Sequence, residues 1–211
     1  MGPLRTAGFR AAVATTSAGL LAAAGIFVSA GTASADTTIT ATYPVTGSTL
    51  IKAANFTLPV GPGKLVSTAD LDTDTLTANL KLPPATGTFK ELGVVPITAT
   101  TTFINNGPTT GTINGDTGAV ATTSEITLKL SNVSVAGIPV SVGNSCETST
   151  PVTVSVASDP GFNILSGGNL SGTYTIPQFK NCGLTTLVIN LTIPGSGNSI
   201  TLTLGKAKVK K

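Results

Sequence analysis

The sequence predicts an all-β protein, built as an antiparallel β-sandwich of the Ig-like or Greek-key type, with a β-barrel as the alternative. Three observations support this class. Apolar residues alternate with threonine and serine over many short segments, turn-forming residues interrupt those segments at short intervals, and no segment of ten or more residues carries an amphipathic helical stripe. Many short alternating strands separated by turns are typical of sandwiches and barrels.

Six segments show the alternation most clearly, with apolar residues at every second position. A period of two indicates a strand with one buried face and one solvated face. Valine, isoleucine and threonine favour such strands because their branched side chains pack well on a pleated surface. The predicted strands are residues 37–43, 75–82, 96–104, 125–135, 151–157 and 199–204.

Two similar short segments predict hairpin turns. Residues 72–76 (DTDTL) and 116–120 (DTGAV) each lead into a strand that contains Leu-Lys-Leu. In the second segment Gly118 can supply a positive φ, which a glycine adopts without steric cost. Asp74 occupies the equivalent place in the first segment, and aspartate tolerates this conformation better than most residues.

The first 35 residues have the pattern of a secretory signal peptide. Two arginines precede an apolar centre at residues 20–28, and a small-residue sequence, Ala-Ser-Ala, ends at Ala35. This combination is typical of a cleaved export signal. The alternative, a membrane anchor, needs about 20 mostly apolar residues, and the apolar centre is shorter than that.

The remaining 176 residues are enough for one domain with its own core. We therefore expect a signal peptide at residues 1–35, a single β-sandwich domain at 36–205 and a basic C-terminal tail at 206–211, with no transmembrane segment after signal cleavage. The expected location is outside the cell, with cell-wall association as a further possibility.

The composition excludes several kinds of chemistry. The chain has no histidine and no tryptophan, and both of its arginines lie within the first ten residues. Histidine is the usual base for serine and cysteine nucleophiles and a common metal ligand, and arginine is the usual partner of phosphate. From residue 36 onward ten lysines balance nine acids, so no broad basic face for nucleic acid is expected. We expect no enzymatic activity and no cofactor.

The two cysteines, Cys146 and Cys182, are predicted to form a disulfide. Neither has a histidine partner, and they do not form a Cys-x-x-Cys motif. In an exported protein disulfides persist, which favours a structural bond over a nucleophile or a metal site. The bond would close a loop of 36 residues, and chain-entropy arguments give it about 4 kcal/mol of stabilisation.

The acidic residues offer two weaker alternatives. Asp70, Asp72 and Asp74 begin like a calcium loop, but Thr75 stands where the loop needs glycine and Lys81 where it needs glutamate. A solvated turn is the simpler interpretation.

A glycosidase needs two carboxylates that face each other across a cleft. Glu91, Glu125 and Glu147 are scattered along the chain, and the sequence brings no pair of them together.

The C-terminal tail is rich in lysine. One interpretation is an electrostatic contact with anionic wall polymer or lipid headgroups. The favoured one is a disordered, solubilising end. The tail lysines are Lys206, Lys208, Lys210 and Lys211.

Several stretches resemble a group of secreted β-domain proteins from actinomycete bacteria that has no known activity. The resemblance covers nearly all of the chain after the signal and implies an extracytoplasmic β-domain with a disulfide between Cys146 and Cys182. It implies no ligand or catalytic residue. The stretches are residues 42–49, 82–100, 135–146, 171–183 and 194–204.

Two functions remain open from the sequence. The first is a structural or adhesive role at the cell surface, which the threonine-rich strand faces favour. The second is a binding module or carrier for an apolar envelope ligand, which high hydropathy and few charges favour. The expected partners are cell-wall polymer, envelope lipid or another surface protein, and not nucleic acid. An internal cavity would favour the carrier.

Overall fold

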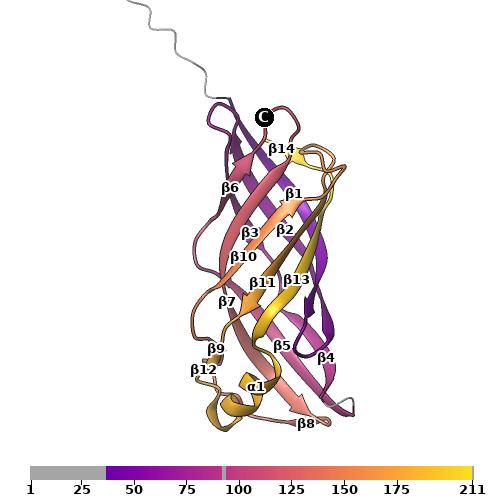
Figure 1. The fold of residues 1–211 in the computed structure, drawn as a ribbon, viewed down its shortest axis with the longest axis vertical. Coiled ribbons are helices and arrows are strands. Elements are labelled where there is room, and N and C mark those ends of the chain that lie inside the picture. The colour runs from indigo at the N-terminus through magenta and orange to yellow at the C-terminus, as the bar shows by residue number, and fades with distance from the viewer. Residues whose placement is uncertain (1–36, 92–93, 211) are drawn as a thin grey trace, which may run out of the picture. The chain divides into compact units, whose positions relative to one another are not determined.

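The protein folds as an antiparallel, all-β structure in the computed structural model, which describes residues 37–91 and 94–210 (Figure 1). The predicted all-β class is confirmed. Of the two expected architectures the protein adopts the alternative, the barrel. The predicted signal peptide lies outside the described residues.

Eight strands form the barrel, and each pairs with its neighbours on both sides. The ring closes because β10 also pairs with β7, from Val152↔Ile126 to Ala157↔Ala121. In ring order the strands are β1 (Thr38–Ile51), β2 (Phe56–Asp70), β3 (Thr75–Lys81), β6 (Thr109–Ile113), β7 (Val120–Val135), β10 (Val152–Ser158), β11 (Gly168–Ile176) and β13 (Gly195–Leu204).

The ring follows chain order, so each barrel strand lies beside the next one in sequence. Three excursions interrupt this order between neighbouring strands. The first is a hairpin of β4 (Ala85–Glu91) and β5 (Val95–Asn105). The second contains β8 (Ile138–Pro139) and β9 (Glu147–Thr148). The third contains β12 (Phe179–Lys180), a 3-10 turn η1 (Gly183–Thr185) and α1 (Thr186–Thr192).

All three excursions extend the barrel at one end (Figure 1). We call this the helix end; it comprises α1, the turn at residues 52–55, Val94 and the turn at residues 136–137. The opposite end, the tail end, comprises the turns at residues 71–74 and 114–119, the loop at 159–167 and residues 205–210. The two ends therefore differ in construction, because one carries extra structure and the other mainly turns.

The strand predictions are confirmed for all six segments, which correspond to β1, β3, β5, β7, β10 and β13. The two predicted hairpin turns are also confirmed. They connect β2 to β3 and β6 to β7, with Asp74 at φ 53° and Gly118 at φ 72°. The two turns lie together, since the amide of Ile113 donates to the carbonyl of Asp74 at 3.0 Å.

The alternation of the sequence separates an apolar interior from a hydroxyl-rich exterior. Two clusters of buried apolar side chains fill the interior, one in each half of the barrel. On the exterior, hydroxyl groups on neighbouring strands pair with each other, as cross-strand threonines commonly do. These pairs are Thr40–Thr68, Thr86–Thr100, Thr88–Thr98 and Thr123–Ser155.

The lysine-rich tail, expected to be disordered, instead adds a short strand, β14 (Lys208–Val209), to the barrel. Val209 pairs with Ala41, and the amide of Lys210 donates to the carbonyl of Thr40 at 2.9 Å. The first part of β1 offers a free edge there, because its β13 neighbour pairs only from Val45 onward. The domain boundary expected at residue 205 therefore falls inside the folded part.

Candidate functional site

Three cavities lie in series along the barrel axis. The tail-end cavity and the helix-end cavity each have a volume of about 70 Å³, and the middle cavity about 50 Å³. Neighbouring cavities share walls. Leu80 and Leu202 border both the tail-end and the middle cavity, while Phe103 and Tyr174 border both the middle and the helix-end cavity. The lumen is thus a slender apolar column divided by single layers of side chains.

The tail-end cavity exists because small residues occupy neighbouring places on adjacent strands. Ala41 pairs with Ser67 across β1 and β2, and Ser67 pairs with Ala78 across β2 and β3. Thr109 and Ser124 continue the row on β6 and β7, where their hydroxyl oxygens lie 2.7 Å apart. A barrel of eight strands is just wide enough for larger side chains to fill it, so a row of small ones leaves space.

Two tyrosines place hydroxyl groups in the lumen. At the tail end, Tyr43 donates from its hydroxyl to the carbonyl of Ile164 at 2.7 Å. Near the middle, the hydroxyl oxygens of Tyr174 and Thr49 lie 2.5 Å apart, and Thr49 donates onward to the carbonyl of Ser199. Burial raises the pKa of both tyrosines above the ordinary value, against a smaller opposing effect of their hydroxyl hydrogen bonds.

The cavities are suited to uncharged ligands. Among the described residues, no lysine, aspartate or glutamate lines any of the three cavities. A charged group placed there would lose its hydration without gaining a partner, which is costly. An apolar chain meets no such penalty, and a charged headgroup would have to stay at the rim.

A short loop closes most of the tail end. The loop at residues 159–167 turns Phe162 and Ile164 toward the tail-end cavity, and Asn163 holds the turn by accepting hydrogen bonds from the amides of Leu165 and Ser166. Leu165 borders the same cavity but is 55% exposed, so the cavity reaches the surface beside this side chain.

The wall of the helix-end cavity contains a seam that side chains close. The described strands give β4 a single partner, β5, although β4 runs next to β2. Across this seam the rings of Phe56 and Phe89 pack with their centroids 6.0 Å apart. Gly87, which borders the cavity, leaves room for the side chains of Phe56 and Leu58.

Helix α1 covers the helix end of the lumen. Ile189 is buried in the adjacent apolar cluster, and Ile193, just after α1, lines the helix-end cavity. The disulfide between Cys146 and Cys182 anchors the segment that leads into α1, and both cysteines are fully buried. The predicted disulfide is therefore confirmed, with a Cα–Cα distance of 4.3 Å.

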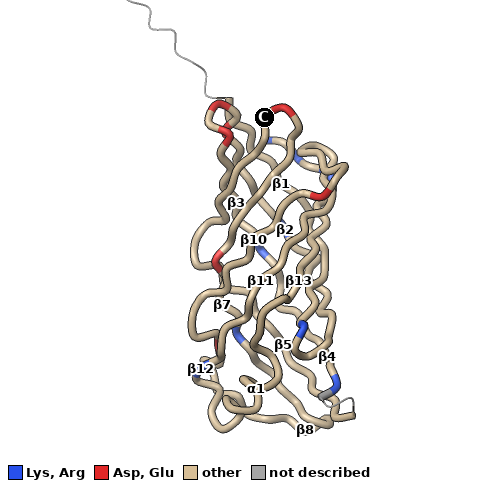
Figure 2. Tube along the Cα trace, in the orientation of Figure 1, with Lys and Arg blue, Asp and Glu red and all other residues tan. Residues whose placement is uncertain are grey.

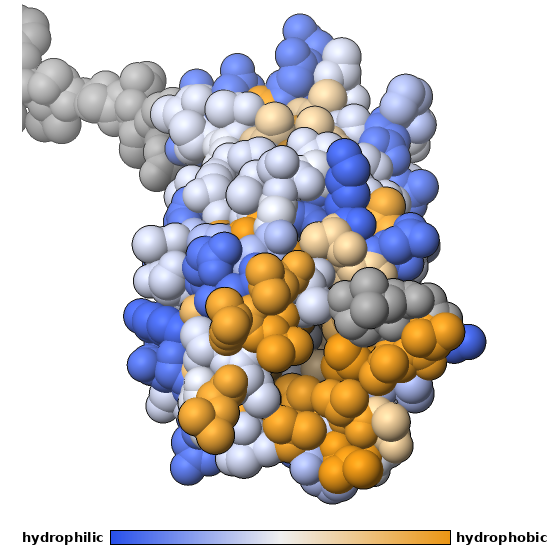
Figure 3. Space-filling view, turned by 60° about the horizontal axis from the view of Figure 1, so that its bottom comes forward, coloured by the Kyte–Doolittle hydropathy of each residue, from blue (hydrophilic) through white to orange (hydrophobic). Residues whose placement is uncertain are grey.

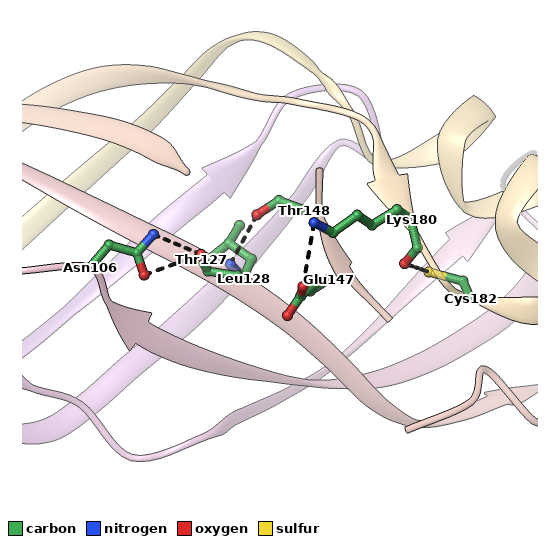
Figure 4. A network of polar contacts seen from close by, with 7 residues as sticks. All are labelled: Asn106, Thr127, Leu128, Glu147, Thr148, Lys180 and Cys182. Carbon is green, nitrogen blue, oxygen red and sulfur yellow. Dashed lines mark hydrogen bonds and ion pairs between the residues drawn. The ribbon is translucent and has the colours of Figure 1, made fainter. Parts of the chain in front are cut away.

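A polar network supports this anchor from the outside (Figure 4). Lys180, two residues before Cys182, lies 3.6 Å from a carboxylate oxygen of Glu147, the residue after Cys146. Thr148 accepts a hydrogen bond from the amide of Leu128 on β7 at 3.3 Å. The disulfide and the ion pair therefore join the same two segments, β9 and β12.

The aspartates singled out as a calcium candidate form a turn. Asp70 accepts hydrogen bonds from the amides of Asp72 and Thr73, and Asp72 accepts one from the amide of Thr37. The side chain of Thr73 is the main reason that the pKa of Asp70 lies below its ordinary value. Within residues 37–91 and 94–210, no three acidic, histidine or cysteine side chains lie close enough to hold a metal ion together.

Glu125, Glu147 and the described tail lysines, Lys206, Lys208 and Lys210, lie apart from the lumen, whereas Lys211 lies outside the described residues. Glu125 accepts a hydrogen bond from Thr153 on the outer wall, and Glu147 is paired with Lys180. Lys206, Lys208 and Lys210 lie at the tail end, close to the aspartate-bearing turns (Figure 2). In the part of the chain described here, no helix is long and apolar enough to cross a membrane.

The sequence alone left open whether the interior holds a cavity, because the lining of a cavity depends on which strands pair. Ala41, Ser67 and Ala78 are ordinary small residues until their strands are aligned. Helix α1 was not predicted, although Leu184, Leu187, Val188 and Leu191 have helical spacing that points to it.

Comparison of the chain with protein-family models, with curated proteins and with solved structures finds no match.

Proposed function

We propose that the protein is a secreted, non-enzymatic carrier that holds a slender apolar chain, such as a fatty acyl or isoprenoid group, in the lumen of its barrel. The observation that carries this proposal is the series of three apolar cavities along the barrel axis. Export is supported by the signal-like sequence at residues 1–35 and by the Cys146–Cys182 disulfide, a bond typical of oxidising compartments.

The shape of the lumen favours a linear ligand. The two end cavities, of about 70 Å³, are about half the size of a cavity of about 150 Å³ that binds benzene, and the middle cavity, of about 50 Å³, is about a third of that size. A bulky ring system therefore does not fit without large rearrangement. A chain one methylene wide needs only the dividing side chains to change rotamer. Leu80, Leu202 and Phe103 are the dividing side chains that such a ligand would displace.

The lining supports a binding role without catalysis. Hydroxyls that face the cavities are paired with carbonyls or with other hydroxyls at Tyr43, at Tyr174 and in the Thr109–Ser124 pair. Such groups can accept one more hydrogen bond from a neutral ligand but are poor acids and bases near neutral pH. The proposed role is therefore retention and transport of the ligand.

The test is titration of the protein with cis-parinaric acid, a fluorescent C18 fatty acid. Ala78→Leu adds three carbon atoms to the wall of the tail-end cavity, and we expect it to weaken probe binding about tenfold. The matched control is Ala121→Leu, which makes the same change on the exposed outer face of β7 and should bind like the native protein.

Two outcomes would contradict the carrier. One is that the native protein does not bind the probe and that native mass spectrometry of the protein from its own culture medium finds no co-purifying apolar mass. The other is that Ala78→Leu folds with an unchanged or higher melting temperature and binds the probe as tightly as the native protein.

A structural or adhesive surface role is the second candidate, supported by the paired hydroxyls of the outer wall. A protein that carries no apolar ligand and that sediments with purified cell wall would favour this role. The closed ring makes it the less favoured candidate, because the unpaired edge of β4 faces β2 across the seam that Phe56 and Phe89 fill and is therefore not free for strand addition.

A further inference from the structure

The helix end carries the five most exposed large aliphatic side chains of the described residues. Leu184 is 101% exposed, Leu187 71% and Leu191 77%. Val188 on the same helix and two residues at neighbouring hairpins, Val94 and Ile138, are also more than half exposed. Figure 3 views this end and shows hydrophobic side chains gathered over it. We call these six residues the helix-end patch.

The patch is not explained by the packing of α1. The inner face of the helix is already satisfied, because Ile189 is buried and Asn190 is hydrogen bonded to Phe179. Leu187, Val188 and Leu191 point away from that face. Such a concentration of exposed leucine and valine is costly in water and usually marks an interaction surface.

Charge is distributed unevenly between the two ends. Figure 2 shows the aspartates at the tail end together with lysines of the C-terminal tail, and at the helix end lysines with few acidic residues. All five aspartates of the described residues lie at the tail end: Asp70 is the last residue of β2, and Asp72, Asp74, Asp116 and Asp159 lie in turns or loops. The helix-end half carries four lysines, Lys52, Lys90, Lys129 and Lys180.

Only two acids belong to the helix-end half. Glu147 forms an ion pair with Lys180, and Glu91 is the last residue of β4. Lys52 lies beside the segment that follows α1, since its side chain approaches Gly197, and Lys90 is near the end of β4, beside the hairpin that carries Val94. The apolar patch is thus flanked by excess positive charge.

We propose that the helix end docks on an anionic lipid surface, with the helix-end patch inserted among the lipids and Lys52 and Lys90 against the headgroups. Exposed aliphatic side chains next to lysines are the combination by which peripheral proteins hold anionic membranes. The tail end, where five aspartates outnumber Lys206, Lys208 and Lys210, then faces away from the surface. This orientation does not depend on what the lumen holds.

A second copy of the chain is the less suitable occupant. The patch consists of separate protrusions, the helix and two hairpins, rather than a flat face, and a fluid bilayer accommodates protrusions more easily than another rigid barrel does. Two copies meeting at this end would also bring their lysines together, and like charges repel.

The test is flotation of the full chain with vesicles of phosphatidylglycerol and phosphatidylcholine, and with vesicles of phosphatidylcholine alone. We expect binding to the anionic vesicles that weakens at high salt, and weaker binding to the neutral ones. Leu187→Ser with Leu191→Ser should reduce binding about tenfold or more. Val209→Ser, a change of an exposed valine at the tail end, should not change it.

The lysines are tested in the same assay. Lys52→Gln with Lys90→Gln should weaken binding to anionic vesicles and flatten its salt dependence. Lys64→Gln with Lys81→Gln, a cross-strand pair on β2 and β3, is the matched control and should behave like the native protein.

Three results would overturn the proposal. The native protein fails to float with anionic vesicles, the leucine double variant floats as well as the native protein, or the control variants lose binding equally. A second copy of the chain would be the occupant if the native protein did not bind vesicles but formed a concentration-dependent dimer. The leucine double variant would then have to lose that dimer.

Discussion

The side-chain amide of Asn190 on α1 pairs in both directions with the backbone of Phe179 on β12. The amide of Phe179 donates to Oδ1 of Asn190 at 2.7 Å, and Nδ2 of Asn190 donates back to the carbonyl of Phe179 at 2.9 Å. A single side chain thus completes the backbone pairing of Phe179 on the side where β12 has no further strand. This contact holds α1 over the helix end of the lumen.

Replacement of Asn190 by alanine should loosen α1 without unfolding the barrel. The change leaves both backbone groups of Phe179 without partners at a partly buried site, which costs about 1–3 kcal/mol locally. We expect the amide of Phe179 to exchange with solvent at least about tenfold faster. Hydrogen exchange followed by mass spectrometry measures this. Asn144→Ala, at an exposed position, is the control; equal protection in both variants would contradict the clamp.

The disulfide should contribute most of its stabilisation through the unfolded state. Cys146→Ala with Cys182→Ala opens a loop of 36 residues, and loop entropy predicts a loss of up to about 4 kcal/mol in the free energy of unfolding. Urea unfolding of the double variant and of the oxidised native protein gives the difference. An unchanged urea midpoint in the double variant would contradict this prediction.

The strands that alternate strictly were predictable from sequence, and the others were not, for a physical reason. In β2 the sequence Pro-Val-Gly-Pro-Gly, residues 59–63, reads as a break. The structure accommodates it as an irregularity opposite Thr46, where pairing passes from Val45↔Gly63 to Gly47↔Val60. Gly61 and Pro62 lie in this irregularity, so the missing amide of the proline disturbs no ladder bond.

The sequence left barrel closure and the lumen undecided, because both depend on which strands pair and in which register. A sandwich and a barrel require the same alternation, and only the pairing of β10 with β7 distinguishes them. The cavity follows from the alignment of Ala41, Ser67 and Ala78, which are far apart in the chain. The disulfide was predictable because two cysteines in an exported chain allow one intramolecular pair.

Asn198 is a second buried polar anchor, and its replacement by aspartate should destabilise the protein in a pH-dependent way. Its side chain is fully buried; Oδ1 accepts from the amide of Lys52, and Nδ2 donates to the carbonyls of Gly195 and Tyr174. Asn198→Asp replaces the donor by a carboxylate oxygen that faces those carbonyls, which costs about 1–3 kcal/mol or more.

The sign of this pH dependence follows from the burial of the new carboxyl group. Burial and the neighbouring carbonyls raise its pKa in the folded state above the unfolded value of about 3.9. The variant should therefore approach native stability at low pH and lose stability as the pH rises above about 4. Thermal melts of both proteins between pH 3 and 7 measure this. A constant difference in melting temperature across that range would contradict the prediction.

The two lumen tyrosines should make the protein less stable at alkaline pH. Burial raises the pKa of Tyr43 and Tyr174 in the folded state, whereas in the unfolded chain both ionise near pH 10. Above about pH 10 the unfolded state therefore binds fewer protons than the folded state, and the free energy of unfolding falls with rising pH until the folded-state pKa values are passed.

The chain has two tyrosines and no tryptophan, so phenolate absorbance near 295 nm reports these two groups directly. We expect phenolate to appear in the native protein only at a higher pH than in the urea-unfolded protein. Tyr43→Phe should remove part of the alkaline fall in stability, and Tyr174→Phe another part. If both phenols ionised in the native protein at the same pH as in urea, water would have free access to the lumen. The lumen would then not be the apolar site on which the carrier proposal depends.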